Sequence, residues 1–374
     1  MVLAARAATL AADGKHALVV SYNITLLNYL RDLAVRHAVP RNVVRRQIDF
    51  LNFHYWCKRV CHECGHAEAY RLLWRSSSDG DGSRLHRRTV LEHALPSLVR
   101  RIYSGSGRIP KYDAILVDEG QDFRPHWWQT LRAALKPGGE MMLVFDKTQN
   151  VYGTAAAWTE DEMEGAGFRG PWNQLKISYR LAPTIVSLVK SFAEEFLTGE
   201  EIDIPEVEPG IQMALFPDEL RWRQVDSEAH GLDACDSELR QMMQRLRADT
   251  AVPDITFLSG QDAGRRFVEM QDLKGVHLVH TFDEDDRSAR RLKRAFFQGA
   301  AGIKATTIHS FKGWEARHLV VYVESVERAE DRAVLYTALT RLLRHEEGSC
   351  LTVVSCCEEL RQYGRKWPDY EEEF

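Results

Sequence analysis

Short apolar runs alternate with helical patterns along much of the chain. A run of strong helix formers occupies residues 2–12, and the apolar run at residues 17–20 is typical of a buried strand. A helical pattern then extends from Thr25 to about His37. Because parallel strands need crossover connections, this alternation predicts an α/β protein with parallel sheets.

The alternation breaks at residues 49–108, which contain a Cys/His cluster and polar loops, and we interpret this segment as an inserted subdomain. The pattern resumes with a predicted strand at 114–117, a helix near 127–135 and a strand at 141–145. Residues 153–171 are rich in Gly and Pro without clear periodicity, which is typical of a connection between domains.

A second series of alternating elements starts near Leu175. Its predicted helices are near 184–197, 236–247, 286–297 and 332–343, and its predicted strands are at 221–225, 255–258, 304–308, 319–322 and 351–355. A length of 374 residues suits two domains. We therefore expect one domain at 1–165, which holds the insertion, and a second at 166–374.

Composition narrows the class of protein only a little. No apolar run approaches the roughly 20 residues that cross a bilayer, and no signal-peptide pattern is present, so we expect a cytoplasmic protein without membrane contact. Seven cysteines, two of them adjacent at 356–357, favour reduced thiols. The net charge of -5 does not indicate a basic nucleic-acid binder, although a local basic groove is enough to bind a single strand.

An acidic pair, Asp118 and Glu119, follows the predicted strand at 114–117. Ligands of parallel α/β sheets collect at the carboxyl ends of the strands. A carboxylate there can hold Mg²⁺ on a nucleotide while its neighbour activates water. The plain alternative is a helix start, where carboxylates suit the dipole.

Further polar residues follow other predicted strands and helices. Gln149 and Tyr152 come after the strand at 141–145, where they can contact a phosphate and stack on a base. Arg180 and Arg341 can bind phosphate bidentately, and their alternative role is a surface ion pair.

Six segments of this kind, in order and spacing, resemble the signature motifs of UvrD/Rep-type superfamily 1 DNA helicases. They are residues 21–23 (motif Ia), 118–122 (II), 145–153 (III), 178–180 (IV), 307–315 (V) and 336–341 (VI). Six ordered matches are far more specific than any one of them.

The resemblance implies two RecA-like domains of the P-loop NTPase type, with ATP and Mg²⁺ as cofactors and single-stranded DNA as partner. It implies that Asp118 holds Mg²⁺ through water and that Glu119 activates the attacking water. Gln149, Arg180 and Arg341 would sense the γ-phosphate, and Glu315 would contact the ribose. The strand would be contacted by Tyr22, Asn23, Tyr152, Thr307 and His309, although Tyr22, Tyr152 and His309 also suit a packing role.

The chain departs from the family in one respect that bears on activity. The 374 residues contain no Gly-rich loop ending in Gly-Lys-Ser/Thr, which in this family cradles the phosphates. The resemblance places residues 1–6 in the helix after that loop, so we expect an N-terminally truncated first domain. A late start site and a split or decayed gene are favoured over a protein that works without the loop, and the DNA upstream of the Met1 codon distinguishes them.

Without that loop, we expect ATP hydrolysis by this chain to be near background. The spacing between motifs IV and V leaves no room for the large accessory domain of the family, which favours translocation over unwinding. The rival interpretations are a non-catalytic DNA-binding or scaffold protein, and a subunit of a nuclease or defence complex whose partner supplies the loop.

Two other clusters have plainer interpretations. Cys57, Cys61, Cys64 and His66 are a possible set of four zinc ligands, but their helical spacing favours a helix end with reduced thiols, and we do not expect zinc. The charged segment at 283–294 is interpreted as a solvated helix face, with nucleic-acid binding by its basic side as the alternative.

Overall fold

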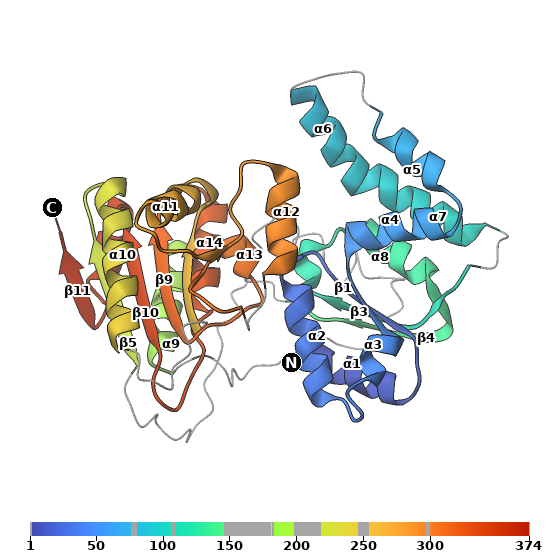
Figure 1. Ribbon diagram of the computed structural model, residues 1–374, viewed down its shortest axis with the longest axis horizontal. Coiled ribbons are helices and arrows are strands. Elements are labelled where there is room, and N and C mark those ends of the chain that lie inside the picture. The colour runs from blue at the N-terminus through green and yellow to red at the C-terminus, as the bar shows by residue number, and fades with distance from the viewer. Residues whose placement is uncertain are drawn as a thin grey trace. The chain divides into compact units, whose positions relative to one another are not determined.

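The computed structural model describes residues 2–75, 81–105, 109–145, 181, 183–197, 218–245, 254–296 and 300–373. The chain forms two compact units, and the described residues of the first lie within 2–145 and those of the second within 181–373. Each unit contains a parallel sheet with helices (Figure 1). The predicted α/β class is confirmed, with two parallel sheets as expected of RecA-like domains.

The first unit contains a four-stranded sheet in the order β2-β1-β3-β4 (Figure 1). Its elements are α1 (Val2–Ala12), β1 (Ala17–Ser21), α2 (Leu26–His37), α3 (Val43–Gln47), β2 (Ile48–Asn52), α4 (Phe53–Glu63), α5 (Ala67–Leu73), α6 (Asp81–Thr89), α7 (Leu95–Ser104), β3 (Tyr112–Asp118), α8 (Pro125–Ala133) and β4 (Leu135–Leu143). A π-helical turn, Val90–Ala94, links α6 to α7, and a 3₁₀ turn, Gly120–Asp122, follows β3.

Residues 49–108, which we interpreted as an inserted subdomain, contribute to the sheet of the first unit. Ile48–Asn52 is a sheet strand, β2, which pairs in parallel with β1 from Ala17↔Ile48 to Ser21↔Asn52. The helices that follow share one hydrophobic core with the sheet, in which Phe53 of α4, Val99 of α7 and Trp127 of α8 are buried. This segment is therefore part of the unit's own core.

The second unit contains a seven-stranded parallel sheet in the order β11-β5-β10-β9-β6-β8-β7. Its elements are α9 (Pro183–Phe196), β5 (Glu219–Gln224), α10 (Glu228–Arg245), β6 (Ile255–Ser259), α11 (Gln261–Leu273), β7 (Val279–His280), α12 (Asp286–Ala295), β8 (Lys304–Thr307), α13 (Ile308–Phe311), β9 (His318–Val323), α14 (Ala329–Leu339), β10 (Cys350–Ser355), α15 (Arg361–Gly364) and β11 (Asp369–Glu372). The elements α11, β7, α13, α15 and β11 were not predicted. The predicted strands at 304–308 and 351–355 correspond to β8 and β10.

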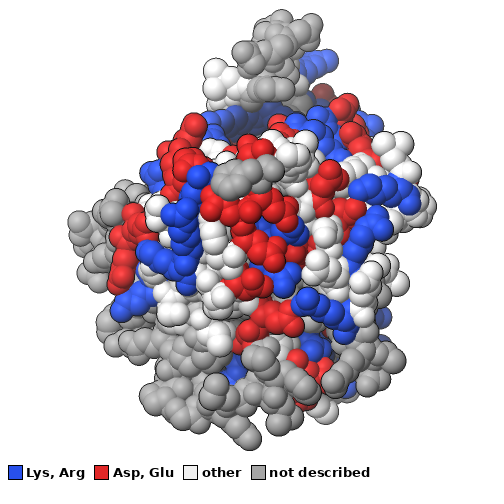
Figure 2. Space-filling view, turned by 90° about the vertical axis from the view of Figure 1, so that its left-hand side faces the viewer, with Lys and Arg blue, Asp and Glu red and all other residues white. Residues whose placement is uncertain are grey.

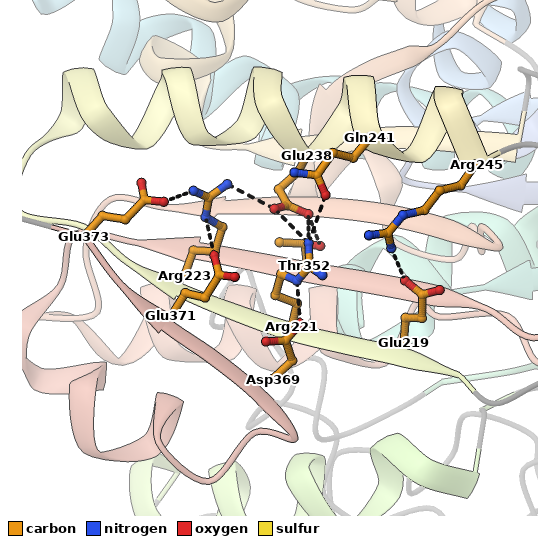
Figure 3. Close-up of polar contacts among 10 residues, drawn as sticks. All are labelled: Glu219, Arg221, Arg223, Glu238, Gln241, Arg245, Thr352, Asp369, Glu371 and Glu373. Atoms are coloured by element: carbon orange, nitrogen blue, oxygen red, sulfur yellow. Dashed lines mark hydrogen bonds and ion pairs between the residues drawn. The ribbon is translucent and has the colours of Figure 1, made fainter.

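Charged side chains join β11 to its neighbours. Arg221 and Arg223 of β5 both donate to the buried carboxylate of Glu238 on α10, at 3.0 Å. Arg221 also bonds Asp369 of β11 at 2.7 Å, and Arg223 pairs with Glu373 (Figure 3). Figure 2, which views this side of the molecule, shows acidic side chains gathered at its centre among basic ones. The edge of the sheet is thus held by ion pairs.

No helix among the described residues is long and apolar enough to span a membrane.

Candidate functional site

In the first unit, motif segments Ia and II lie together at the carboxyl ends of the two central strands, β1 and β3. Ser21, the last residue of β1, is the direct partner of Asp118, the last residue of β3. Both strands run in parallel, so the residues that follow them, Tyr22 and Asn23 on one and Glu119 on the other, leave the sheet on the same side. The sheet thereby brings together four of the predicted site residues.

Glu119 has an unusual backbone. Its φ of 54° and ψ of 50° lie in the left-handed region, and no other non-glycine residue among those described has a positive φ. Such a conformation costs a residue with a Cβ about 1–2 kcal/mol, and strain of this kind concentrates at functional sites. The strain falls on the residue to which the resemblance assigns activation of water.

The loop after Glu119 is fixed to the end of β4. The Gly120 N–H donates to the carbonyl of Val144 at 2.9 Å. A Cβ on Gly120 would lie only 2.3 Å from Cδ1 of Leu143, so a side chain does not fit here unless Leu143 moves. The close approach of this loop to β4 therefore favours glycine at this position.

Two further residues of this loop support the acidic pair. The Gln121 side-chain amide donates to the Glu119 carboxylate at 2.6 Å, and the Asp122 N–H donates to the Glu119 carbonyl at 2.9 Å. Both Gln121 and Asp122 are buried. Sequence reasoning did not single them out, although they lie inside the motif segment at 118–122.

Tyr22 and Asn23 are engaged within the first unit. The Tyr22 ring stacks on Trp127 at 5.9 Å and meets His54 edge-on at 5.9 Å, and burial raises the pKa of Tyr22. The Asn23 side-chain oxygen accepts from the backbone N–H of Thr25 at 3.2 Å and from its hydroxyl at 2.9 Å. One face of Tyr22 is thus used for packing, and the Asn23 oxygen holds the turn into α2.

Gln149, Tyr152 and Arg180 lie outside the described residues.

In the second unit, Thr307 and His309 lie where β8 passes into α13. Thr307 caps this short helix by accepting from the Ser310 N–H at 3.1 Å, and its hydroxyl donates to that of Ser310 at 2.9 Å. Burial, together with the nearby cations of Lys293 and Lys312, lowers the pKa of His309 to about 4. The imidazole is therefore neutral at pH 7, in basic surroundings.

Arg341 and Glu315 are brought together by backbone contacts in the second unit. The Ala316 N–H donates to the Arg341 carbonyl at 3.1 Å, which places Glu315 beside this part of the chain. The Arg341 side chain is 1% exposed, and its Nε donates to the carbonyl of Thr337 at 3.0 Å. The alternative of a surface ion pair is thus wrong for Arg341, because its guanidinium lies in the interior.

The cysteine cluster lies in the first unit, on and after α4. Cys57 and Cys61 are fully buried in the core, Cys64 is half-buried, and His66 is exposed. Burial raises the pKa of the Cys61 thiol to about 11 and raises the pKa of the Cys57 thiol well above its ordinary value, so both thiols are protonated at neutral pH. Within the described part of the chain, no group of three His, Cys, Asp or Glu side chains is placed to hold a metal ion.

No family model matches the chain, and no curated protein matches it in sequence. Among solved structures, it is similar to the C-terminal domain of a possible DNA helicase from Lactobacillus plantarum WCFS1. The two are 16% identical with a TM-score of 0.32, over 52% of this chain and 98% of that one. A likeness of this size decides neither the family nor the activity.

Proposed function

We propose that this chain is the motor portion of a UvrD/Rep-type superfamily 1 DNA helicase or translocase that acts on single-stranded DNA. The proposal is supported by six motif segments in the family's order. The single observation that carries it furthest is the acidic pair at the end of β3, where Glu119 is held in a left-handed conformation beside Asp118.

The residues at the carboxyl end of β3 suit nucleotide chemistry. Carboxylate oxygens are the ligands that Mg²⁺ prefers, and Asp118 would bind the ion through water. Glu119 would orient the attacking water, and the hydrogen bond from Gln121 fixes the direction of its carboxylate. ATP and Mg²⁺ are the cofactors of this proposal.

The proposal also predicts weak catalysis by these 374 residues. They contain no Gly-Lys-Ser/Thr loop to supply backbone N–H groups and a lysine to the phosphates. We infer that these 374 residues bind single-stranded DNA but hydrolyse ATP scarcely at all unless such a loop is supplied to them.

Two measurements on the same preparation test this. Fluorescence anisotropy with a labelled oligo-dT should show DNA binding, and steady-state ATP hydrolysis with that DNA should stay near background for the chain alone. Material co-purified from native cells should show DNA-stimulated hydrolysis that is lost when the chain carries Glu119→Gln. Robust turnover by the chain alone would contradict the need for the loop, and absence of DNA binding would contradict the whole proposal.

The second candidate is a non-catalytic DNA-binding protein derived from such a motor. The interior position of Arg341 favours it, because the guanidinium donates to the Thr337 carbonyl and the Thr340 hydroxyl. This candidate is favoured if every preparation binds DNA without hydrolysing ATP. It also requires that the Glu119→Gln variant keeps the wild-type DNA affinity.

A further inference from the structure

Helix α12 of the second unit carries four arginines on one face. Arg287, Arg290, Arg291 and Arg294 follow the spacing i, i+3, i+4, i+7, and all four are exposed. At 1.5 Å per residue, this arginine stripe is about 10 Å long. The acidic residues of the segment precede it, and Asp285 caps the helix by accepting from the Ser288 N–H at 2.8 Å.

Like charges at this spacing oppose helix formation. The stripe contains four arginine pairs at i, i+3 or i, i+4, each of which destabilises a helix by roughly 0.2–0.5 kcal/mol. The helix is instead held at its ends, by the Asp285 cap and by Phe296. Phe296 is 1% exposed and contacts the Trp314 ring at 5.5 Å. The fold therefore presents four guanidinium groups in a row on the surface of this unit.

The helix lies near the predicted strand-contacting residues of the second unit. Phe296, directly after α12, packs on Trp314, which follows α13. Lys293 of α12 is close enough to His309 of α13 to disfavour its protonation. Thr307, whose hydroxyl lies at the start of α13, belongs to the same region. Cations, a neutral imidazole and a hydroxyl thus gather on one part of this unit.

We propose that the arginine stripe of α12 binds the phosphate backbone of the same single strand that Thr307 and His309 would contact. This inference rests on the proposed function, because that function supplies the strand. Guanidinium groups bind phosphate oxygens bidentately, so four in a row suit a chain of phosphates better than isolated carboxylates. Backbone contacts carry no sequence information, and binding here should not depend on base sequence.

The test compares two double variants of the whole chain. Arg287→Gln with Arg291→Gln removes half of the stripe. Arg240→Gln with Arg245→Gln makes the same charge change on α10 of the same unit, where both side chains are about half exposed (52% and 53%). The affinity for oligo-dT and for a mixed-sequence oligonucleotide is measured between 50 and 300 mM KCl. Circular dichroism melts establish that each variant is folded.

For the stripe variant, we expect about tenfold weaker binding to both oligonucleotides at the lowest salt. The slope of log K against log salt is negative, and in the stripe variant it should become less negative by about 1.4. This value corresponds to two phosphate contacts, each of which releases about 0.7 counterion. The α10 variant should keep the wild-type slope.

The possible failures are distinguishable. If the wild type binds DNA and both variants keep its slope, the stripe is not a DNA contact, while the proposed function stands. If the wild type binds no DNA, the proposed function fails first. Unchanged DNA binding with loss of binding to phosphatidylserine vesicles would assign the stripe to a membrane surface and overturn the inference.

Discussion

The side-chain amide of Gln121 donates a 2.6 Å hydrogen bond to the carboxylate of Glu119, two residues earlier in the chain. The left-handed backbone of Glu119 and the turn at Gly120–Asp122 bring the two side chains together. The acidic residue is therefore aimed by its own loop, at the expense of backbone strain. The loop thus has two separate effects: the strained backbone lowers stability, and the hydrogen bond orients the carboxylate.

Glu119→Gly should be more stable than Glu119→Ala. Both substitutions remove the carboxylate that accepts from the buried Gln121 amide, so both variants lose that hydrogen bond. Glycine differs from alanine in adopting the left-handed region without the steric penalty of a Cβ, and its greater freedom in the unfolded chain offsets only part of that gain. We expect the free energy of unfolding, from urea titration, to be higher in Glu119→Gly than in Glu119→Ala by up to about 1 kcal/mol. Equal stability of the two variants would contradict the strain.

Glu238→Ala should destabilise the second unit strongly. Its carboxylate is 3% exposed and bonds both Arg221 and Arg223, so its removal leaves two largely buried guanidinium groups without their shared partner. Loss of one member of such a network costs about 3 kcal/mol.

The matched control for this change is Glu219→Ala, which breaks the exposed pair between Glu219 of β5 and Arg245 of α10 (Figure 3). Exposed pairs contribute less than about 1 kcal/mol. Urea titrations that gave equal losses for the two variants would show that the buried network does not hold β5, α10 and β11 together.

Arg341→Lys should destabilise the second unit although it keeps the charge. The guanidinium donates to the Thr337 carbonyl at 3.0 Å and to the Thr340 hydroxyl at 2.9 Å, and a lysine ammonium cannot reproduce this fork. We expect a loss of about 2 kcal/mol in urea titration. Arg344→Lys, a few residues further along, is the control, and wild-type stability of Arg341→Lys would show that these bonds are dispensable.

Stability should fall as the pH drops from about 6.5 to 4. Burial lowers the pKa of His54 to about 4, so between that value and the ordinary value of 6.5 the unfolded chain binds the proton and the folded chain does not. The stability due to neutral His54 is thus complete above pH 6.5 and lost toward pH 4.

The variant His54→Gln keeps a donor for the Leu91 carbonyl, which His54 contacts at 3.1 Å. Between pH 7 and pH 5 it should lose up to about 2 kcal/mol less stability than the wild type, in urea titrations at each pH. An unchanged pH dependence in His54→Gln would show that this histidine does not titrate as its burial requires.

Elements with a clear apolar pattern were predictable, and those held by other forces were not. The apolar runs of β1, β3, β6 and β9 were identified because these strands are buried in the sheets. In contrast, β11 reads Asp-Tyr-Glu-Glu, which has low strand propensity. It pairs with β5 because Arg221 and Arg223 of that strand bind its carboxylates.

The helix α11 was missed for a different reason. It contains Gly264, which lowers helix propensity, and the structure shows why a glycine is there. A Cβ at this position would lie 2.1 Å from the ring of Phe282, so the helix approaches the segment after β7 too closely for any side chain. A packing requirement of this kind cannot be read from a local pattern.

In the candidate site, too, some features were predictable from a local apolar pattern and others were not. The placement of Asp118 and Glu119 at a strand end followed from the apolar run before them. The left-handed backbone of Glu119 did not, since glutamate rarely adopts this conformation. The interior position of Arg341 depends on tertiary contacts with Trp314 and was likewise beyond a local pattern.

The acidic strand β11 also affects how the protein behaves at high concentration. It lies at one edge of the seven-stranded sheet, and an open edge is a template on which strands of other molecules add. Asp369 and Glu371 of this strand and Glu373 just after it are about half exposed, and they would face the same acidic residues if two copies met edge to edge. The ion pairs that attach this strand to the fold thus also leave an edge that repels its own copies and protects the protein against aggregation.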